Sequence, residues 1–482
     1  MKTAVFTIGS RNYFALVKTL MGSLADTNPQ WDRFVGVADS LQFLQEDGYK
    51  LLSIDDIDLP HPKQMEFRYS IMEFNTAIKP FIFKALFKKF GYDRVIYLDP
   101  DIFVYDKMEE LEEAFDRGSS FVLTPHFTGL WDDDKKPDEV SILLSGTYNC
   151  GFLGLAKSDE TYDFLEWWGE KLEKQCIVDI EHGIFVDQKW VDLVPGFFDN
   201  VFILRHEGYN TAYWNLSHRK PEKRDGKFYY NNQPLRFFHF SGLDPSNIEN
   251  VSKHQNRYKI DEIGITKELF EDYAAAVLSN DHASYRTMPY AFATYENGDP
   301  VSDAHRHMYK CNRWIQEMCG ENPFAKNEIF AVLDHGQVGG PRVGGDNRAA
   351  SAAQKKLDKF RNYFSIMNKW IKLRDAAASM EKYLVDHGYT KIAIYGMGEL
   401  GMRLYETLKD SEQVKIVYGI DKLMKAPVKG VEVYKPDDEL PEANVIIISA
   451  TFDFSAIKKS IADKVDYPII SLEEVVMGCD DI

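Results

Sequence analysis

The sequence predicts an α/β fold in which two separate α/β domains are joined by helical segments. One observation is a strand-like run from Thr3 to Ile8 that passes through Gly9 into Phe14–Met21, where apolar residues have helical spacing. Another is Arg94–Leu98, whose branched and aromatic residues suit a strand buried on both faces. The third is a strand and glycine-rich turn that begin at Lys391. Strand-turn-helix units of this kind are typical of a sheet covered by helices.

Length and charge limit the classes of protein that fit. The chain has 482 residues, more than one core usually supports, so two or three domains are expected. Hydrophobic residues make up 44% and aromatic residues 14%, which is enough for packed cores and argues against extensive disorder. The formal net charge of -18 argues against a nucleic-acid partner, because phosphate backbones need clustered Lys and Arg. An anionic substrate would therefore need a local cation or metal.

The cysteines and the first residues indicate the compartment. The five cysteines are odd in number and lack a C-x-x-C spacing, so we interpret them as reduced thiols rather than as disulfides or a zinc site. Met1 and Lys2 lead directly into the first strand, without the apolar core of a signal peptide. No run of about 20 apolar residues occurs. We expect a cytoplasmic protein without a transmembrane segment, with peripheral attachment to the inner membrane face left open.

Two aspartates, Asp99 and Asp101, follow the buried strand Arg94–Leu98. Pro100 stands between them and marks the strand end, because it cannot donate to a central ladder. Alternation along an extended chain sends both carboxylates to the same side. Unpaired carboxylates there are costly, and a divalent cation that carries a phosphate-bearing ligand would compensate them. The pattern predicts a metal-diphosphate site, with turn-capping aspartates as the alternative.

Other polar residues stand where predicted strands end. Phe34–Asp39 is interpreted as a second short strand with an acid at its end. Ligands of such sheets gather at the carboxyl ends of strands, so we expect Thr7–Tyr13, Asp39 and the two aspartates to share one crevice. Phe81–Phe90 is predicted to be an amphipathic helix. Lys79 precedes it, either as a solvated charge or as a cation that faces a diphosphate.

A second group of candidates follows the acidic segment Trp131–Glu139, which is predicted to be a loop. In the next predicted strand, Gly146–Leu155, Asn149 offers a donor and an acceptor to a sugar hydroxyl. Gly151 would let the backbone approach a ligand closely. A glycine-rich buried strand without a ligand is the alternative.

The last candidates of this half are an acid-amide pair and a histidine. Asp187 and Gln188 lie side by side after the predicted helix Thr161–Gln175. His239 lies in the aromatic strand Leu235–Gly242, where a core histidine and a site at the strand end are both compatible with the sequence.

Together these segments resemble a GT-A fold glycosyltransferase, most closely glycosyltransferase family 8 and related bacterial enzymes that build surface polysaccharides. The resemblance covers about the first 255 residues and rests on the order of the motifs in them. After a nucleotide-side first strand come Asp-x-Asp at positions 99 and 101, Asn-x-Gly at 149 and 151, Asp-Gln at 187 and 188, and His-x-x-Gly at 239 and 242.

The resemblance implies that Asp99, Asp101 and His239 ligate Mn²⁺ or Mg²⁺ bound to the diphosphate of a nucleotide sugar, and mixed carboxylate and imidazole ligation favours Mn²⁺. Such a metal would stabilise the charge of the departing nucleoside diphosphate. The family pattern implies retention of configuration, with Asp187 and Gln188 near the reacting carbon. If the enzyme inverts instead, Asp187 is the first candidate for the base. The implied donor-binding residues are Thr7, Asn12, Tyr13, Lys79, Asn149, Gly151 and Lys253.

One position departs from the family pattern. The family has a diphosphate-binding lysine after its late histidine motif, whereas this chain has Pro245 at the corresponding position. The diphosphate clamp must therefore differ. Lys253 is the nearest downstream replacement, and Lys79 is another.

The C-terminal segment is predicted to be a small Rossmann-like domain. A strand leads into a G-x-G-x-x-G turn at Gly396, Gly398 and Gly401, and Asp421 lies 20 residues further on, where a ribose-binding carboxylate is expected. These four residues are candidates for an accessory nucleotide site. About 90 residues leave no room for a separate substrate domain, so independent redox catalysis is not expected. The predicted domains are a GT-A domain at 1–258, a helical extension at 259–335, a Gly-rich linker at 336–350, a connecting helix at 351–388 and the Rossmann-like domain at 389–482.

The sequence thus predicts a metal-dependent hexosyltransferase for bacterial surface-glycan assembly. Its donor would be a nucleotide sugar, with a UDP-sugar as the family expectation, and its acceptor a glycan, a lipid-linked glycan or a protein. Two alternatives stay open. One is a nucleotide-sugar oxidoreductase or epimerase that uses the C-terminal domain, and the other is a noncatalytic sugar-nucleotide-binding scaffold.

Overall fold

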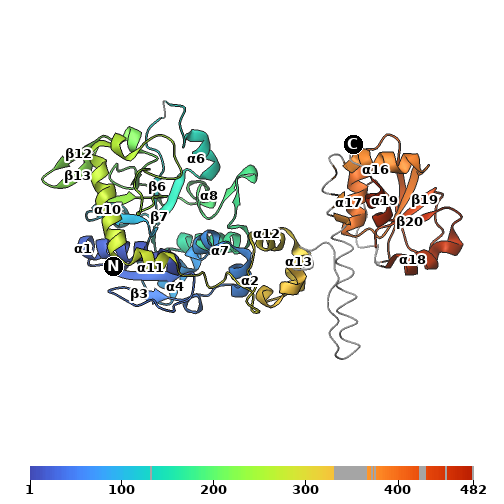
Figure 1. Ribbon diagram of the computed structural model, residues 1–482, viewed down its shortest axis with the longest axis horizontal. Helices are drawn as coiled ribbons and strands as arrows, with labels where there is room; N and C mark the ends of the chain where they lie inside the picture. The colour runs from blue at the N-terminus through green and yellow to red at the C-terminus, as the bar shows by residue number, and fades with distance from the viewer. Residues whose placement is uncertain are drawn as a thin grey trace. The chain divides into compact units, whose positions relative to one another are not determined.

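The computed structural model forms two compact units, Met1–Asn327 and Glu328–Ile482 (Figure 1). It describes residues 1–130, 133–330, 366–367, 369–370, 373, 376–422, 430–450 and 453–479. The predicted linker at 336–350 and most of the predicted connecting helix at 351–388 lie outside the described residues, as do Trp131 and Asp132 of the predicted acidic loop. The predicted domain boundaries therefore stay predictions.

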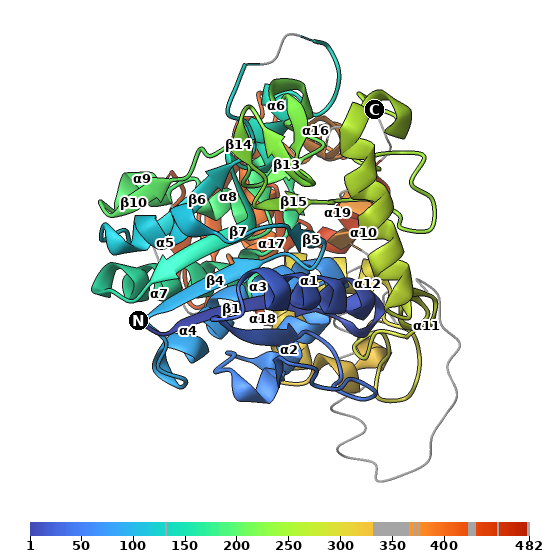
Figure 2. The same ribbon diagram turned by 90° about the vertical axis from the view of Figure 1, so that its left-hand side faces the viewer.

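A seven-stranded mixed sheet organises the first unit, in the spatial order β10-β6-β7-β4-β1-β2-β3. Figure 2 shows β6, β7, β4 and β1 side by side. β7 runs antiparallel to both of its neighbours, and the other pairs are parallel. The strands are β1 (Thr3–Gly9), β2 (Asp32–Val37), β3 (Lys50–Leu52), β4 (Arg94–Leu98), β6 (Phe121–Pro125), β7 (Tyr148–Ala156) and β10 (Val201–Ile203). This sheet confirms the predicted α/β class.

Both faces of this sheet are buried, as the apolar composition of β4 requires. Successive residues point to opposite faces. One face carries Phe6, Tyr97 and Leu153, and the other carries Val5, Ile96 and Phe152. The first face packs against α4 (Lys79–Lys88) and α7 (Asp159–Gln175), and the second against α1 (Phe14–Thr27) and α5 (Glu109–Asp116).

The other helices of the unit start and stop at recognisable signals. α3 (Ile71–Ala77) begins with a capping box between Ser70 and Glu73. α6 (Glu139–Ser145) begins at the N-cap Asp138, where the predicted loop Trp131–Glu139 ends, and none of its residues is buried. The remaining helices before residue 260 are α2 (Pro62–Arg68), α8 (Gln188–Val191) and α9 (Val194–Phe197).

A small three-stranded sheet lies beside the end of β4. Its order is β11-β15-β5, formed by β11 (Thr211–Ala212), β15 (Phe237–His239) and β5 (Ile102–Val104). β15 pairs antiparallel with β5, which sets His239 opposite Ile102. This register brings a histidine from late in the chain next to Asp101. Two hairpin-like sheets complete the unit, formed by β12 (Pro221–Arg224), β13 (Lys227–Tyr230) and β14 (Gln233–Pro234), and by β8 (Val178–Asp179) and β9 (Ile184–Phe185).

The predicted helical extension lies in the first unit as far as Asn327. It contains α10 (Lys267–Ser279), α11 (His282–Arg286), α12 (Asp303–Cys311) and α13 (Arg313–Cys319). The buried guanidinium of Arg306, on α12, donates to the backbone carbonyls of residues 66, 67, 69 and 292. Asp39 accepts from the backbone N–H groups of Arg11 and Ala291. These bonds fix the extension to the end of α2 and to Asp39, which follows β2.

The second unit contains a five-stranded parallel sheet in the order β18-β17-β16-β19-β20. Its strands are β16 (Lys391–Tyr395), β17 (Lys415–Ile420), β18 (Val433–Tyr434), β19 (Val445–Ile448) and β20 (Ile469–Ser471). Its described helices include α16 (Ala376–Asp386), α17 (Glu399–Leu408), α18 (Phe454–Ile461) and α19 (Leu472–Gly478). Across the described residues of both units, no helix combines the length and apolar character needed to cross a membrane.

Candidate functional site

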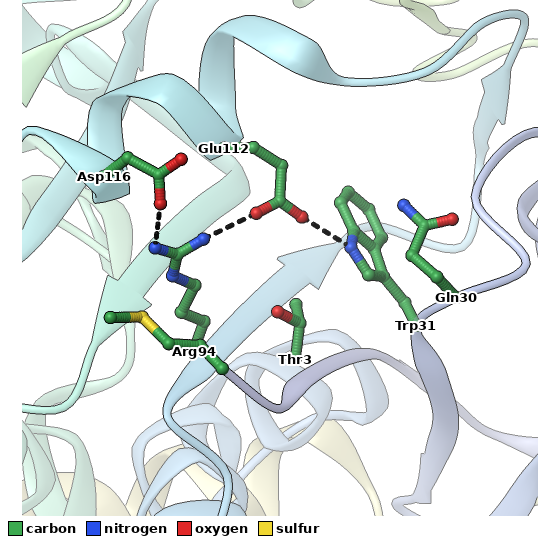
Figure 3. Close-up of a pocket in the computed structure, with 7 residues that line it drawn as sticks. Thr3, Gln30, Trp31, Arg94, Glu112 and Asp116 are labelled. Carbon is green, nitrogen blue, oxygen red and sulfur yellow. Dashed lines mark hydrogen bonds and ion pairs between the residues drawn. The ribbon is translucent and has the colours of Figure 1, made fainter.

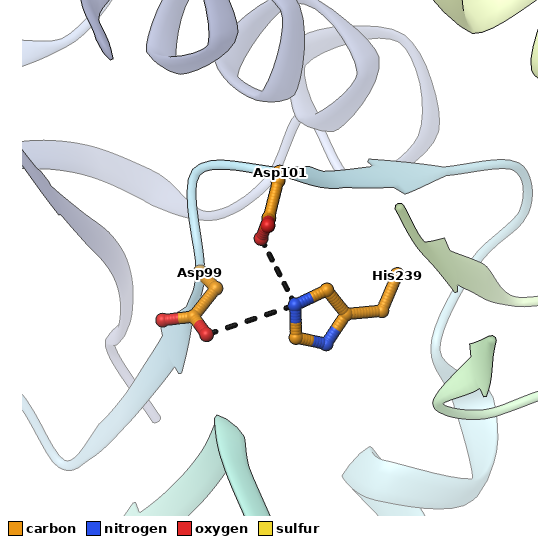
Figure 4. A group of neighbouring side chains, drawn as sticks. All are labelled: Asp99, Asp101 and His239. Atoms are coloured by element: carbon orange, nitrogen blue, oxygen red, sulfur yellow. Dashed lines mark ion pairs between the residues drawn. The ribbon is translucent and has the colours of Figure 1, made fainter. Parts of the chain in front are cut away.

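Asp99, Asp101 and His239 converge at the carboxyl end of β4 (Figure 4). The two aspartates come from the turn between β4 and β5, and the histidine ends β15. His239 Nε2 lies 2.9 Å from Asp101 Oδ1 and 3.7 Å from Asp99 Oδ2. The ligand atoms of the three side chains lie within 4.8 Å of one another, which suits a single divalent cation.

Gly151 makes room for this cluster. Its backbone carbonyl accepts from the N–H of Asp99 at 2.8 Å, so β7 runs directly beside the site. A Cβ at position 151 would lie 2.4 Å from His239 Cε1, 2.7 Å from Asp99 Oδ2 and 2.8 Å from Asn149 Oδ1. The predicted close approach at Gly151 therefore takes place against the metal-site side chains. The donor set and this space fit a divalent metal.

A buried ion pair between Lys79 and Asp187 lies next to the cluster. Lys79 Nζ donates to the carboxylate of Asp187 and, at 2.9 Å, to the carbonyl of Cys150. It also lies 4.0 Å from the centre of the Tyr97 ring, whose hydroxyl donates to Asp99 at 2.5 Å. Lys79 and Asp187 are 1% and 2% exposed. The solvated surface charge is therefore excluded for Lys79, because its ammonium group is buried against Asp187, and the diphosphate contact stays a prediction.

Burial and these partners perturb the titration of the cluster. Burial raises the pKa of Asp99, although Lys79 and His239 oppose that shift. Burial opposes protonation of His239, but the carboxylates of Asp101 and Asp99 outweigh it and raise its pKa. For Lys79, burial is likewise outweighed by Asp187 and Asp99, and its pKa is raised. The site therefore combines buried cationic groups with two partly exposed carboxylates.

A hydrogen-bonded network extends from His239 into β7. His239 Nδ1 lies 3.2 Å from Asn149 Oδ1, and Asn149 Nδ2 lies 3.2 Å from His126 Nε2 and 3.3 Å from Gln188 Oε1. The edge of the Trp214 ring system packs against both His126 and His239, with ring centres 5.2 and 5.1 Å apart. All four hydrogen-bonding side chains are buried.

The other predicted donor residues surround the cluster at different depths. Thr7, in β1, is fully buried, and Asn12 accepts from Ser10 Oγ at 2.7 Å in the turn Arg11–Tyr13. Tyr13 is 46% exposed, and its pKa is raised by burial and by the charge of Asp101. Lys253 is exposed, and its N–H donates to the carbonyl of Gly242 at 3.1 Å. The structure therefore places Tyr13 and Lys253 at the rim of the site.

Asp39 lies beside Arg11, within the segment Thr7–Tyr13 with which it was expected to share a crevice, and its carboxylate is occupied by groups of the chain. It is 6% exposed and accepts from three backbone N–H groups, those of Arg11, Ser40 and Ala291. Sequence reasoning also missed Tyr97 and His126. An aromatic side chain two residues before an aspartate is too common a pattern to mark Tyr97, whereas a histidine at the end of β6 was a usable signal for His126.

The predicted accessory site of the second unit has the expected turn. Gly396 has a φ of 91°, in the region that favours glycine, and a Cβ at Gly401 would lie 2.0 Å from the carbonyl oxygen of Gly396. Asp421 Oδ2 accepts from the N–H of Met397 at 2.8 Å. The carboxylate thus holds the turn, which ends at the N-cap Gly398. Nucleotide binding by these residues stays a prediction.

A separate cavity of about 410 Å³ lies at the amino ends of the strands of the main sheet, away from the Asp-Asp-His cluster at their carboxyl ends (Figure 3). Thr3 and Arg94, the first residues of β1 and β4, line it. Glu112 is bound to Arg94 at 2.6 Å and to Trp31 at 2.8 Å, and Asp116 is bound to Arg94 at 2.5 Å. Both carboxylates of this cavity are therefore paired with the same guanidinium, that of Arg94.

Comparisons with known proteins give partial likenesses. No family model matches the chain. Among curated proteins, it is similar to the uncharacterised protein YfnD of Bacillus subtilis (strain 168), with 24% identity over 249 residues, covering 49% of this chain and 76% of that protein. Among solved structures, it is similar to the glycosyltransferase GlyE of Streptococcus pneumoniae TIGR4, with 18% identity, 61% of this chain and 68% of that chain covered, and a TM-score of 0.34. It is also similar to the galactosyltransferase LgtC in complex with donor and acceptor sugar analogues, with 16% identity, 57% and 95% covered, and a TM-score of 0.33.

Proposed function

We propose that this chain is a metal-dependent glycosyltransferase that moves a sugar from a nucleotide sugar, with a UDP-sugar favoured, to a hydroxyl acceptor. The observation that carries the proposal is the convergence of Asp99, Asp101 and His239 at the carboxyl end of β4. Open α/β sheets bind their ligands at the carboxyl ends of their strands. The side chains that can bind a cation therefore lie where a nucleotide is expected to bind.

The three side chains would hold a divalent cation, for which their mixed carboxylate and imidazole atoms favour Mn²⁺ over Mg²⁺. When bound, the cation would supply positive charge to offset that of a departing nucleoside diphosphate. Tyr97 orients Asp99 by donating to one carboxylate oxygen, which leaves Oδ2 directed toward His239. Lys253, at the rim beside Gly242, is our candidate for the diphosphate contact that Pro245 cannot make.

Retention of configuration is the stereochemical outcome we favour. An inverting enzyme needs a carboxylate that removes the proton of the acceptor hydroxyl. Asp187, the candidate for that base, is 2% exposed and bound to Lys79, so an acceptor cannot reach it in this conformation. The pair instead holds the Lys79 ammonium group against the Tyr97 ring and close enough to Asp99 to interact with its carboxylate.

The biological setting of this activity is inferred from the family resemblance. We place the enzyme in the assembly of a bacterial surface glycan, on the cytoplasmic side of the membrane, with a glycan, lipid-linked glycan or protein as its acceptor. The second unit is proposed as an accessory Rossmann-like domain whose turn could take a nucleotide. The exposed Tyr13 and Lys253 mark the side from which donor and acceptor would enter.

The test is release of free UDP from a panel of UDP-sugars by the full chain, with Mn²⁺ and with chelator. Asp101→Ala is the site variant, and Asp116→Ala, in the cavity at the amino ends of the strands, is the matched carboxylate control. We expect release from one or two donors that requires Mn²⁺, is lost in Asp101→Ala and persists in Asp116→Ala. Release that is indifferent to both chelator and Asp101 would contradict the proposed site.

A further inference from the structure

The network behind His239 has a fixed hydrogen-bond direction, which can be deduced from backbone groups alone. An amide side chain or an imidazole can be placed in two orientations, so its own atoms do not settle which end donates. A backbone N–H always donates and a backbone carbonyl always accepts. The network ends on such groups at two independent places, so its direction can be followed inward from both.

The first fixed end is at Gln188. Its Nε2 donates to the carbonyl of Ser145 at 2.8 Å, and its Oε1 accepts from the N–H of Cys150 at 3.1 Å. Both backbone partners require this orientation of the amide. Gln188 Oε1 is therefore an acceptor, and the Asn149 atom that lies 3.3 Å from it must be the Nδ2 donor.

The second fixed end is at His126. Its Nδ1 lies 3.3 Å from the carbonyl of Thr147, which can only accept, so Nδ1 carries the proton. In a neutral ring Nε2 is then an acceptor, and it lies 3.2 Å from Asn149 Nδ2. Burial lowers the pKa of His126 to about 4, which keeps the ring neutral near pH 7. Both ends thus demand the same orientation of Asn149.

We infer that His126 and Gln188, acting through Asn149, hold a proton on Nδ1 of His239, so that Nε2 is the nitrogen left to bind a divalent cation at the Asp99–Asp101 cluster. With Nδ2 committed to His126 and Gln188, Asn149 presents Oδ1 to His239 Nδ1 at 3.2 Å. That nitrogen must then carry a proton. The remaining nitrogen, Nε2, is the one that faces Asp101 and Asp99.

This inference rests on the proposed metal-dependent function and assigns positioning roles within it. Hydrogen bonds of this kind orient ligating histidines and set which nitrogen binds the metal. Asn149 and Gln188 were expected to touch the donor sugar and the reacting carbon. The network gives their amide groups a different task, since every hydrogen-bonding atom of Gln188 already has a partner within the chain.

Mn²⁺ binding to the full chain, followed through the electron paramagnetic resonance signal of free Mn²⁺ without any sugar nucleotide, tests the inference. Asn149→Leu removes the acceptor from His239 and should weaken Mn²⁺ binding by about 10- to 100-fold. His126→Phe keeps a ring against Trp214 but cannot accept from Asn149, and should weaken binding by about 10-fold. His126→Gln restores an acceptor and should stay within about threefold of the unmodified chain.

The opposite pattern would overturn the inference. If Asn149→Leu keeps its Mn²⁺ affinity while its affinity for UDP-sugar falls, Asn149 contacts the donor and not the histidine. If Asn149→Leu does not fold, the two His126 variants decide the matter, because equal Mn²⁺ affinities for His126→Phe and His126→Gln contradict the network.

A second measurement does not depend on any metal. Nitrogen NMR of the chain labelled with [¹⁵N]histidine, with His239 assigned from the signal lost in His239→Gln, reports which ring nitrogen is protonated. We expect Nδ1 to carry a proton whether or not Nε2 is also protonated, because Asn149 Oδ1 accepts from Nδ1. A ring with its proton on Nε2 and none on Nδ1 would overturn the inference. If the unmodified chain binds no Mn²⁺, the proposed function fails, and this measurement still tests the network by itself.

Discussion

Gly151 is the position where the smallest change should have the clearest effect on the site. In Gly151→Ala the added methyl group would lie 2.4 Å from His239 Cε1 and 2.7 Å from Asp99 Oδ2. To reach an ordinary contact of 3.4 Å, the histidine would have to retreat by about 1 Å and the carboxylate by about 0.7 Å. A metal site tolerates deviations of only about 0.2 Å in its ligand distances. We therefore expect Mn²⁺ affinity to fall by about 100-fold, equivalent to about 2.8 kcal/mol.

Gly154→Ala is the matched control, because it lies in the same strand three residues further on. Its added methyl group would meet Leu111, Phe115 and Val122 at 3.1 to 3.3 Å, on the apolar side that faces α5. Overpacking of this kind costs about 1–3 kcal/mol of stability. We expect Gly154→Ala to lower the midpoint of urea unfolding with Mn²⁺ affinity unchanged.

The assay measures both quantities in each variant, Mn²⁺ affinity by electron paramagnetic resonance and stability by urea unfolding. The reasoning is refuted if Gly151→Ala binds Mn²⁺ as tightly as the unmodified chain. It is also refuted if the two alanine variants lose Mn²⁺ affinity equally, since the loss would then reflect general damage to β7.

Three further predictions concern buried charges. Lys79→Met leaves the carboxylate of Asp187 buried without its partner and should cost about 3–5 kcal/mol of stability in urea unfolding, most of it recovered when Asp187→Leu is added. The pKa of His126 lies at about 4, below its ordinary 6.5, so the unfolded chain binds a proton that the folded chain excludes between those values. Stability should therefore fall by about 1.4 kcal/mol per pH unit as pH drops below 6.5, relative to His126→Gln, and parallel pH profiles of the two proteins would contradict this. Arg306→Leu leaves four backbone carbonyls without their hydrogen-bond donor and should lower the free energy of unfolding by about 3 kcal/mol or more. An unchanged midpoint of urea unfolding would show that these carbonyls find other donors.

The main sheet could be predicted because its strands carry their own signals. Arg94–Leu98 was predicted with the bounds that β4 has, since its branched and aromatic residues are buried on both faces and a proline follows directly. α6 was not predicted. The segment before it is acidic and contains proline, and none of the helix residues is buried, so no apolar periodicity marks it.

Spacing along the chain could not predict the contacts of the site. His239 reaches Asp101 through the pairing of two strands of three residues each, β15 and β5, and the family resemblance, not periodicity, placed the histidine there. Lys79 and Asp187 are 108 residues apart, and the sequence left the lysine open between a surface charge and a diphosphate contact. Their ion pair depends on the first residue of α4 lying next to the N-cap residue of α8, which no local pattern encodes.

β7 runs antiparallel to β6, so the connection between these two strands begins and ends at the same end of the sheet. This arrangement affects how much the length and sequence of the connection can vary. His126 follows β6 and Thr147 precedes β7, and the N–H of His126 donates to the carbonyl of Thr147 at 3.0 Å, so both ends of this connection are closed at the site. A connection that leaves and returns at one point can be lengthened, shortened or exchanged without altering the register of the sheet. The backbone carbonyl of Ser145 also accepts from Gln188 Nε2 at 2.8 Å, so the part of this connection that can vary without disturbing the network ends before Ser145.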